Sequence, residues 1–182
     1  MSEWFGKSTA SEVLCDDLPN YNWYAVRTKS RCEKKLSSDL KQSRIRFYLP
    51  IYSKVSLSGR VQVNREIPLF SGYIFTYVDY ETRFKVADNK LVANLINVNQ
   101  VNLFLSELNN IERALQCSHA IAPVDYHQVG EKVRIIKGPF EGQEGEIIRF
   151  KNKFTLILRA SLIGQAVTVE INATDTEPLS VD

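Results

Sequence analysis

The pattern of apolar and polar residues predicts a chain that mixes strands with helices. Trp23 to Thr28 alternates with the period of two that a half-buried strand requires. Ile45 to Leu49 and Leu91 to Val98 are predicted to be strands as well. Apolar residues at helical spacing predict a helix over 102–116. The residues on its apolar stripe are Phe104, Leu108, Ile111 and Leu115.

Two further helices are predicted in the first hundred residues. One runs to about Ser43 and turns Leu36 and Leu40 inward. Ser30 and Glu33 have the spacing of a capping box at its start, in which each side chain satisfies a free backbone donor of the other residue. The other helix is short and covers Glu81 to Asp88.

The segment from 55 to 78 predicts a hairpin followed by an aromatic strand. Val55 and Leu57 are expected to face Val61 and Val63 across a two-residue turn at Ser58-Gly59. Lys54 and Arg60 make the tip of this hairpin basic. Pro68 to Val78 follows and is the most aromatic strand, with apolar residues on both of its faces.

Glycines at fixed points around one short strand mark the segment from Val129 to Gly145, which reads VGEKVRIIKGPFEGQEG. Val133 and Ile135 alternate with charged residues, and Gly138-Pro139 indicates a tight loop. Glycine is needed where the chain takes positive φ or passes close to another backbone. The segment therefore predicts the edge of a small, sharply folded β-barrel.

Together these elements predict two domains. The first, 21–116, is α+β, with an antiparallel sheet and flanking helices, and the second, 129–182, is a small all-β barrel. Residues 117–128 carry no period and contain Pro123, so they are predicted to form a linker. Residues 1–20 are predicted to be a mobile tail.

The basic charge of the chain lies in the middle segment, although the net charge is only +2. Residues 21–116 carry fifteen basic and eight acidic side chains, a net of +7, whereas 1–20 and 117–182 are both net acidic. A field of one sign raises the encounter rate with a polyanion or an acidic protein surface. A solvated basic face without a partner is the alternative explanation.

These motifs, in this order, resemble those of the NusG family of transcription elongation factors. The glycine-rich segment looks like a KOW motif, and SLIGQAVTVEI from Ser161 to Ile171 resembles the closing strands of the family's SH3-like C-terminal domain. Trp23-Tyr24-Ala25-Val26, then Leu49-Pro50, then PLFSGYIF from Pro68 to Phe75 look like the N-terminal domain of NusG and its paralogue RfaH. The resemblance covers nearly all of residues 22–179.

The resemblance implies a factor that binds bacterial RNA polymerase through the coiled coil of the polymerase clamp. The family docks through an apolar patch on the sheet, and the matching positions are Phe70, Tyr73, Phe75 and Val98. Partly exposed aromatics are typical of interface centres, but both faces of this strand could equally be internal. SGYIFTYV also resembles weakly the RNP1 strand of an RNA-recognition motif, although Ser71, Ile74 and Tyr77 depart from that pattern.

A basic cluster surrounds the start of the first helix. Its members are Arg27, Lys29, Arg31, Lys34 and Lys35. Phosphate contact is the plain expectation for such a cluster, and the resemblance implies the non-template DNA strand of the transcription bubble. Ordinary solvated helix surface is the alternative. The threonine-rich element by which RfaH touches the opposite side of the polymerase cleft is replaced here by Arg83-Phe84-Lys85-Val86.

The resemblance also raises the possibility that the C-terminal domain folds as a helical hairpin. Thr155 to Leu158 and Ala166 to Ile171 are rich in β-branched residues, and Gly164 interrupts the stretch between them, so a stable barrel is predicted. By resemblance, Phe140 and Ile163 would form an edge that binds a ribosomal protein or a termination factor. Phe140 could instead plug one end of the barrel.

Little in the sequence indicates an enzyme or a bound cofactor. It contains no P-loop, GxSxG or HExxH motif, and its two histidines, His119 and His127, lie in the predicted linker. Cys117, His119, Asp125 and His127 match no familiar zinc site, and three widely spaced cysteines indicate no disulfide framework. No apolar run is long enough to span a membrane, and the N-terminus lacks a signal-peptide core, so a cytoplasmic monomer is expected.

The sequence thus favours a specialised NusG paralogue, similar to RfaH, that promotes processive elongation or antitermination at particular operons. A KOW-containing structural RNA-binding protein of the ribosome is the alternative.

Overall fold

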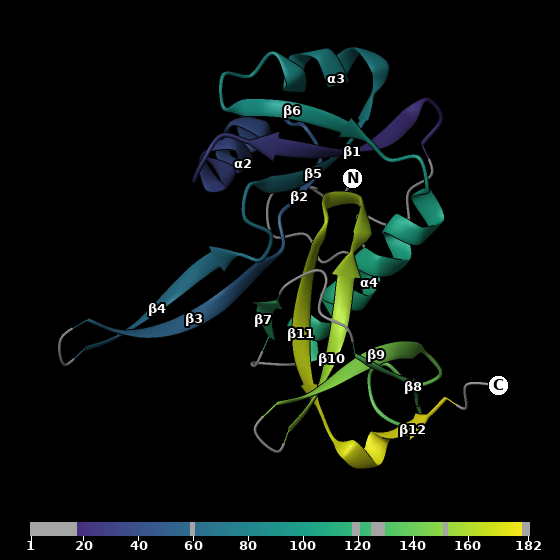
Figure 1. Ribbon diagram of the computed structural model, residues 1–182. Helices are drawn as coiled ribbons and strands as arrows, with labels where there is room; N and C mark the ends of the chain where they lie inside the picture. The colour runs from purple at the N-terminus through teal and green to yellow at the C-terminus, as the bar shows by residue number, and fades with distance from the viewer. Residues whose placement is uncertain (1–17, 59–60, 118–120, 125–129, 151–152, 180–182) are drawn as a thin grey trace. The chain divides into compact units, whose positions relative to one another are not determined.

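The computed structural model describes residues 18–58, 61–117, 121–124, 130–150 and 153–179 (Figure 1). The chain divides into two compact units, Met1–Leu105 and Ser106–Asp182. The division falls inside helix α4 (Val101–Cys117), whereas the sequence placed it at the end of that helix. The predicted fold class is confirmed. An N-terminal α/β domain with antiparallel sheets is followed by a C-terminal all-β sheet domain.

A four-stranded antiparallel sheet forms the centre of the first unit, with the strand order β2-β5-β1-β6. The strands are β2 (Phe47–Tyr48), β5 (Tyr73–Asp79), β1 (Tyr21–Thr28) and β6 (Val92–Asn97). Helices α2 (Glu33–Gln42) and α3 (Tyr80–Ala87) lie beside this sheet (Figure 1). Each of these elements lies within a few residues of its predicted position.

One face of the sheet packs against α2 and α3. Val26 and Ile74 alternate out of β1 and β5 toward this face and are fully buried, as is Leu36 of α2. Val86 is the buried residue of α3. Burying an aliphatic side chain of this size contributes about 1.5–3 kcal/mol, so this cluster supplies much of the stability of the unit.

The other face of the sheet is apolar and aromatic. Trp23, Phe75 and Tyr77 lie on it, and Phe104 at the start of α4 packs against the rings of Trp23 and Phe75. The ring centroids of Phe75 and Phe104 are 5.3 Å apart in an edge-on arrangement, and those of Trp23 and Phe104 are 5.6 Å apart. Both faces of the sheet are therefore internal at β5.

The hairpin of β3 (Ile51–Ser58) and β4 (Val61–Pro68) forms a separate two-stranded sheet and extends away from the larger sheet (Figure 1). Its register differs from the prediction by one residue. Ser56 is opposite Val63, and Val55 is opposite Asn64, so the predicted pairing of the valines is wrong. A one-residue change of register moves a side chain to the opposite face. Residues 59–60, including Arg60, lie outside the described residues.

The second unit contains a six-stranded antiparallel sheet with the order β12-β8-β9-β10-β11-β7. Its strands are β7 (Ile121–Val124), β8 (Glu131–Ile135), β9 (Glu144–Phe150), β10 (Lys153–Ala160), β11 (Gln165–Ile171) and β12 (Thr176–Pro178). Strand β10 pairs with β11 from Phe154 to Ala160, which confirms the prediction of strands rather than a helical hairpin here.

Strand β7 lies where the sequence predicted a linker without structure. It pairs with β11 from Ala166 to Val169, and its Ile121 is buried. The Thr168 hydroxyl also donates a hydrogen bond of 3.2 Å to the Ala122 carbonyl. Pro123 is compatible with this position because β7 is an edge strand and needs no donor on its outer side.

The glycines of the KOW-like segment have the predicted roles. Gly142 has φ +81° in the turn between β8 and β9, where a side chain would be strained. At Gly130 an added Cβ would lie 2.7 Å from the backbone oxygen of Ile147, so the close approach of the β9 backbone requires glycine.

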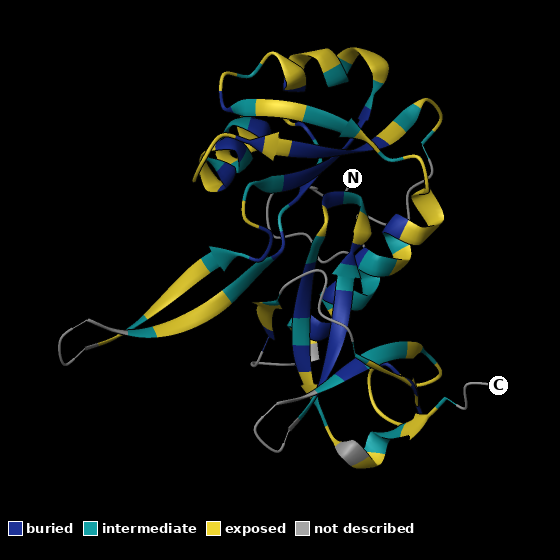
Figure 2. Ribbon diagram, in the orientation of Figure 1, coloured by how far each residue is buried: buried dark blue, intermediate teal, exposed yellow. Residues whose placement is uncertain are grey.

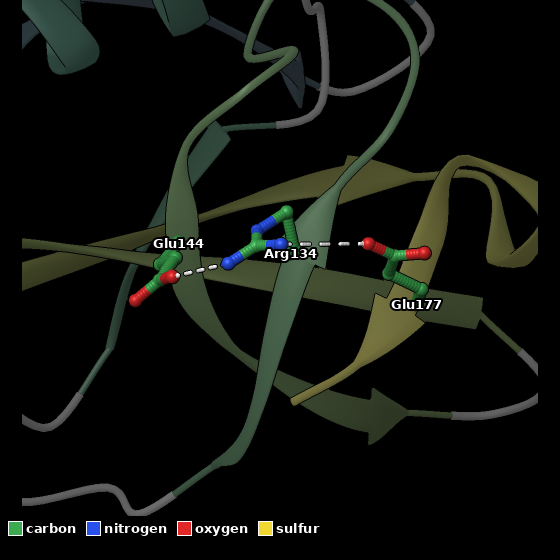
Figure 3. A network of polar contacts seen from close by, with 3 residues as sticks. All are labelled: Arg134, Glu144 and Glu177. Carbon is green, nitrogen blue, oxygen red and sulfur yellow. Dashed lines mark hydrogen bonds and ion pairs between the residues drawn. The ribbon is translucent and has the colours of Figure 1, made fainter. Parts of the chain in front are cut away.

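A charged row crosses three strands of this sheet (Figure 3). Arg134 of β8 lies opposite Glu144 of β9 and Glu177 of β12. Its guanidinium is 3.0 Å from the Glu144 carboxylate and 4.0 Å from that of Glu177. About half of each side chain is exposed, so these pairs help to define the register and contribute less than about 1 kcal/mol each.

Candidate functional site

The basic cluster lies where β1 ends and α2 begins. All five of its side chains are exposed: Arg27, Lys29, Arg31, Lys34 and Lys35. The connecting turn is held by backbone hydrogen bonds, from Lys29 N to Leu91 O and from Cys32 N to Lys29 O. Arg31 takes the left-handed conformation, with φ 57°. A rigid turn thus presents the cluster to solvent.

The charges of this cluster are largely uncompensated. Of the five side chains, only Lys34 has a polar partner within the described part of the chain, and that partner is the backbone carbonyl of Glu66, 2.5 Å from its Nζ. No carboxylate among the described residues forms an ion pair with the cluster. The cluster is therefore free to contact phosphate groups.

Glu33 does not form the predicted capping box. The N-cap residue of α2 is Cys32, and no side chain caps the helix. The Glu33 carboxylate instead accepts a hydrogen bond of 2.6 Å from the backbone N–H of Gly72, and the side chain is buried. This bond connects the helix carrying the basic cluster to the turn that precedes β5.

The four predicted polymerase-binding residues have different exposures. Phe70 and Phe75 are 1 % and 0 % exposed, so Phe75 is not part of a partly exposed aromatic row, and the alternative in which both faces of the strand are internal fits instead. Phe75 packs against Phe104 at the start of α4, and Phe70 packs against Phe75. Tyr73 and Val98 are half-buried and accessible in part. Only these two could contact a partner without rearrangement.

An exposed aromatic cluster on α3 was not predicted from the sequence. Tyr80 and Phe84 are 64 % and 46 % exposed, and their ring centroids are 5.0 Å apart. The Arg83 guanidinium lies 4.7 Å from the centroid of each ring. The i, i+4 spacing of the two rings was the available signal.

The N-terminus of α3 is capped by Asp79. Its carboxylate accepts a hydrogen bond of 2.7 Å from the backbone N–H of Thr82. This bond is the main cause that lowers the pKa of Asp79 below its ordinary value, and the Thr82 hydroxyl adds to the effect. The cap fixes the helix that carries the aromatic cluster.

The residues expected to bind a partner in the second unit are buried. Phe140 and Ile163 are 3 % and 9 % exposed, so they do not form an exposed edge, and Phe140 instead fits the alternative in which it closes the core. Nearby Ile136 is the exposed apolar residue of this loop. Within the same unit, Glu107 accepts hydrogen bonds from the backbone N–H and the hydroxyl of Ser161, next to Ile163.

The remaining candidates lie in a part of the chain that is only partly described. The Cys117 side chain and the residues His119, Asp125 and His127 fall outside the described residues. Among those that are described, no group of histidine, cysteine or acidic side chains is suited to hold a metal ion. None of the described helices has the length and hydropathy of a membrane span.

An antiparallel sheet with two flanking helices, a long hairpin and a following β unit are also found together in a solved structure. A solved structure titled "Domain interaction in Thermotoga maritima NusG" has the same fold, with a TM-score of 0.52 and 19% sequence identity, and covers 88% of this chain and 98% of that one.

Sequence comparisons identify the family. A model of the family described as "Transcription termination factor nusG" matches residues 21–129. The NusG protein of Helicobacter pylori, named "Transcription termination/antitermination protein", is 24% identical and covers 87% of this chain and 98% of its own length. The NusG protein of Rickettsia typhi, which has the same name, is 26% identical and covers 82% of this chain and 86% of its own length. The chain belongs to the NusG family.

Proposed function

We propose that this protein is a transcription elongation factor that binds bacterial RNA polymerase and promotes processive elongation or antitermination at particular operons. Support comes from the family model, which spans the whole first sheet and both of its helices. The relatives' names refer to termination and antitermination. The observation that carries the proposal on this chain is the basic cluster, which is exposed and has no carboxylate partner among the described residues.

In this proposal Tyr73 and Val98 both contact the coiled coil of the polymerase clamp. They lie toward opposite ends of β1, since Tyr73 is paired with Arg27 and the backbone N–H of Val98 donates to the Trp23 carbonyl. Both residues are half-buried, and Tyr73 projects from the same face of β5 as the buried Phe75, which packs against Phe70. Apolar side chains that are rigidly backed and partly exposed are the kind that carry binding energy at interfaces.

The basic cluster contacts the non-template DNA strand in the transcription bubble. Phosphate contacts release counterions and need no base recognition, so several lysines and arginines on one rigid turn are sufficient. The second unit recruits a ribosomal protein or a termination factor, and exposed Ile136 is a candidate contact. The whole protein acts in the cytoplasm as a monomer.

Charge reversal in the basic cluster tests the DNA contact. The triple variant Lys29→Glu, Arg31→Glu, Lys34→Glu should crosslink much more weakly to the non-template strand of a reconstituted elongation complex, while retaining most of its affinity for polymerase. The matched control reverses three exposed lysines elsewhere, Lys41, Lys90 and Lys132, and should crosslink as the wild type does. Undiminished crosslinking of the cluster variant, or equal loss in the control, would remove the DNA role.

A further inference from the structure

The hairpin of β3 and β4 carries a pair of like charges that face each other. Lys54 and Arg65 are direct cross-strand partners, and both are exposed. Like charges directly opposite each other destabilise a strand pair. The hairpin has no further strand beside it among the described residues, so its stability is already modest.

No acidic residue in the described part of the hairpin compensates this pair. Side chains alternate between faces, and the face with Lys54 and Arg65 otherwise carries Tyr52, Ser56, Val63 and Ile67. Glu66 is paired with Ser53 and lies on the opposite face. Neither the Lys54 side chain nor the Arg65 side chain has a hydrogen bond or ion pair within the described residues. The face thus has two free positive charges and is complementary to a polyanion.

The hairpin is continuous with the basic cluster. The hydrogen bond from Lys34 Nζ to the Glu66 carbonyl joins α2 to β4 one residue from Arg65. The described side chains of both strands are exposed or half-buried, and none of them is buried (Figure 2). At about 3.3 Å per residue, Lys54 lies roughly 10 Å along β3 from its first residue, so the charges stand away from the sheet.

The side chains favour duplex over single-stranded DNA as the ligand. Binding of single strands relies on aromatic side chains that stack on bases. Among the described side chains of the hairpin, the only aromatic is Tyr52, which is half-buried near the base. A two-stranded ribbon with cations on one face fits instead against the phosphates of a duplex, whose major groove admits such a ribbon.

We infer that the β3–β4 hairpin is a second nucleic-acid surface, which contacts the phosphate backbone of duplex DNA through Lys54 and Arg65. This goes beyond the proposed function, because it assigns a different element and a different form of DNA. It also needs no polymerase to be tested, so either proposal can fail while the other stands.

A variant that stabilises the hairpin while removing its charge separates binding from folding. Lys54→Glu places a carboxylate opposite Arg65, which should raise the melting temperature of the full chain. The same change should weaken binding to a fluorescently labelled mixed-sequence duplex by about tenfold at low salt. The Lys54→Ala/Arg65→Ala variant should reduce the slope of log K against log salt concentration by about 2, the value for two lost phosphate contacts.

The control changes the net charge by the same amount on the opposite face. Gln62→Glu/Asn64→Glu adds two negative charges to the same hairpin and should bind duplex nearly as the wild type does. The inference would be overturned if this control weakened binding equally, or if Lys54→Glu bound duplex as well as the wild type does. It would also be overturned if Lys54→Glu lowered the melting temperature. So would a loss confined to the single strand of the same sequence.

Discussion

Single residues of this chain take roles that are set by partners distant in sequence. Glu33 has the spacing of a capping residue, yet its carboxylate binds the backbone N–H of Gly72. Phe75 has the pattern of an interface residue, yet Phe104 covers it. In both cases the local pattern is compatible with two roles, and tertiary structure selects one of them.

The buried ring of Phe75 predicts a large effect on stability. Phe75→Ala should lower the free energy of unfolding by about 3–5 kcal/mol, because it leaves a cavity between β5 and α4. Tyr73→Ala should cost much less stability, since Tyr73 is half-buried, and should instead weaken polymerase binding by about tenfold, the effect of a residue worth about 1–2 kcal/mol. Urea unfolding and a polymerase-binding titration measure the two effects. A Phe75→Ala variant as stable as wild type would contradict the packing described here.

The Glu33–Gly72 hydrogen bond predicts an asymmetry between two neighbouring substitutions. Glu33→Gln should destabilise the first unit by about 1–3 kcal/mol, because it replaces a buried, charge-assisted bond. Ser30→Ala should be nearly neutral, whereas loss of a true capping serine would cost about 1 kcal/mol. Thermal unfolding of both variants checks this. If Ser30→Ala is the more damaging change, the capping box exists after all.

At the scale of elements, α3 depends on the ionised carboxylate of Asp79. Because its pKa is lowered in the folded state, the stabilisation is present at neutral pH and is lost as the pH falls through the folded pKa. Asp79→Ala should therefore lower the melting temperature at neutral pH, and the difference from wild type should close on acidification. Asp88→Ala, at the exposed opposite end of the helix, is the control and should show no such convergence. A difference from wild type that is independent of pH would exclude the cap as its cause.

The order of most elements could be predicted from the sequence, because periods of two and of helical spacing are local properties. The register of the β3–β4 hairpin could not, since valines and serines alternate and a slip of one residue leaves both patterns plausible. Strand β7 could not be predicted either, because it depends on pairing with β11, which lies more than forty residues further along the sequence.

Of the candidate site, only the basic cluster could be predicted from the sequence. Exposed lysines and arginines remain exposed in almost any fold, so the basic cluster could be found from composition and spacing. Whether Phe140 or Ile163 reaches solvent depends on how the second unit closes around them, and the sequence contains no signal for that.

At the scale of the whole molecule, the excess of basic charge belongs to the first unit, together with both surfaces assigned here to nucleic acid. The family model covers this unit and extends to residue 129. Its sheet supplies a rigid frame, from which α2 presents the basic cluster and β3–β4 extends. The second unit is an all-β module that suits recruitment of a further protein.

The most direct measurement is co-purification of the tagged full-length chain from its own cells at high salt, with the bound proteins identified by mass spectrometry. We expect the subunits of RNA polymerase, and we expect Tyr73→Ala/Val98→Ala to recover much less of them while remaining folded. Recovery of ribosomal particles without polymerase would contradict the account and favour a structural RNA-binding protein of the ribosome.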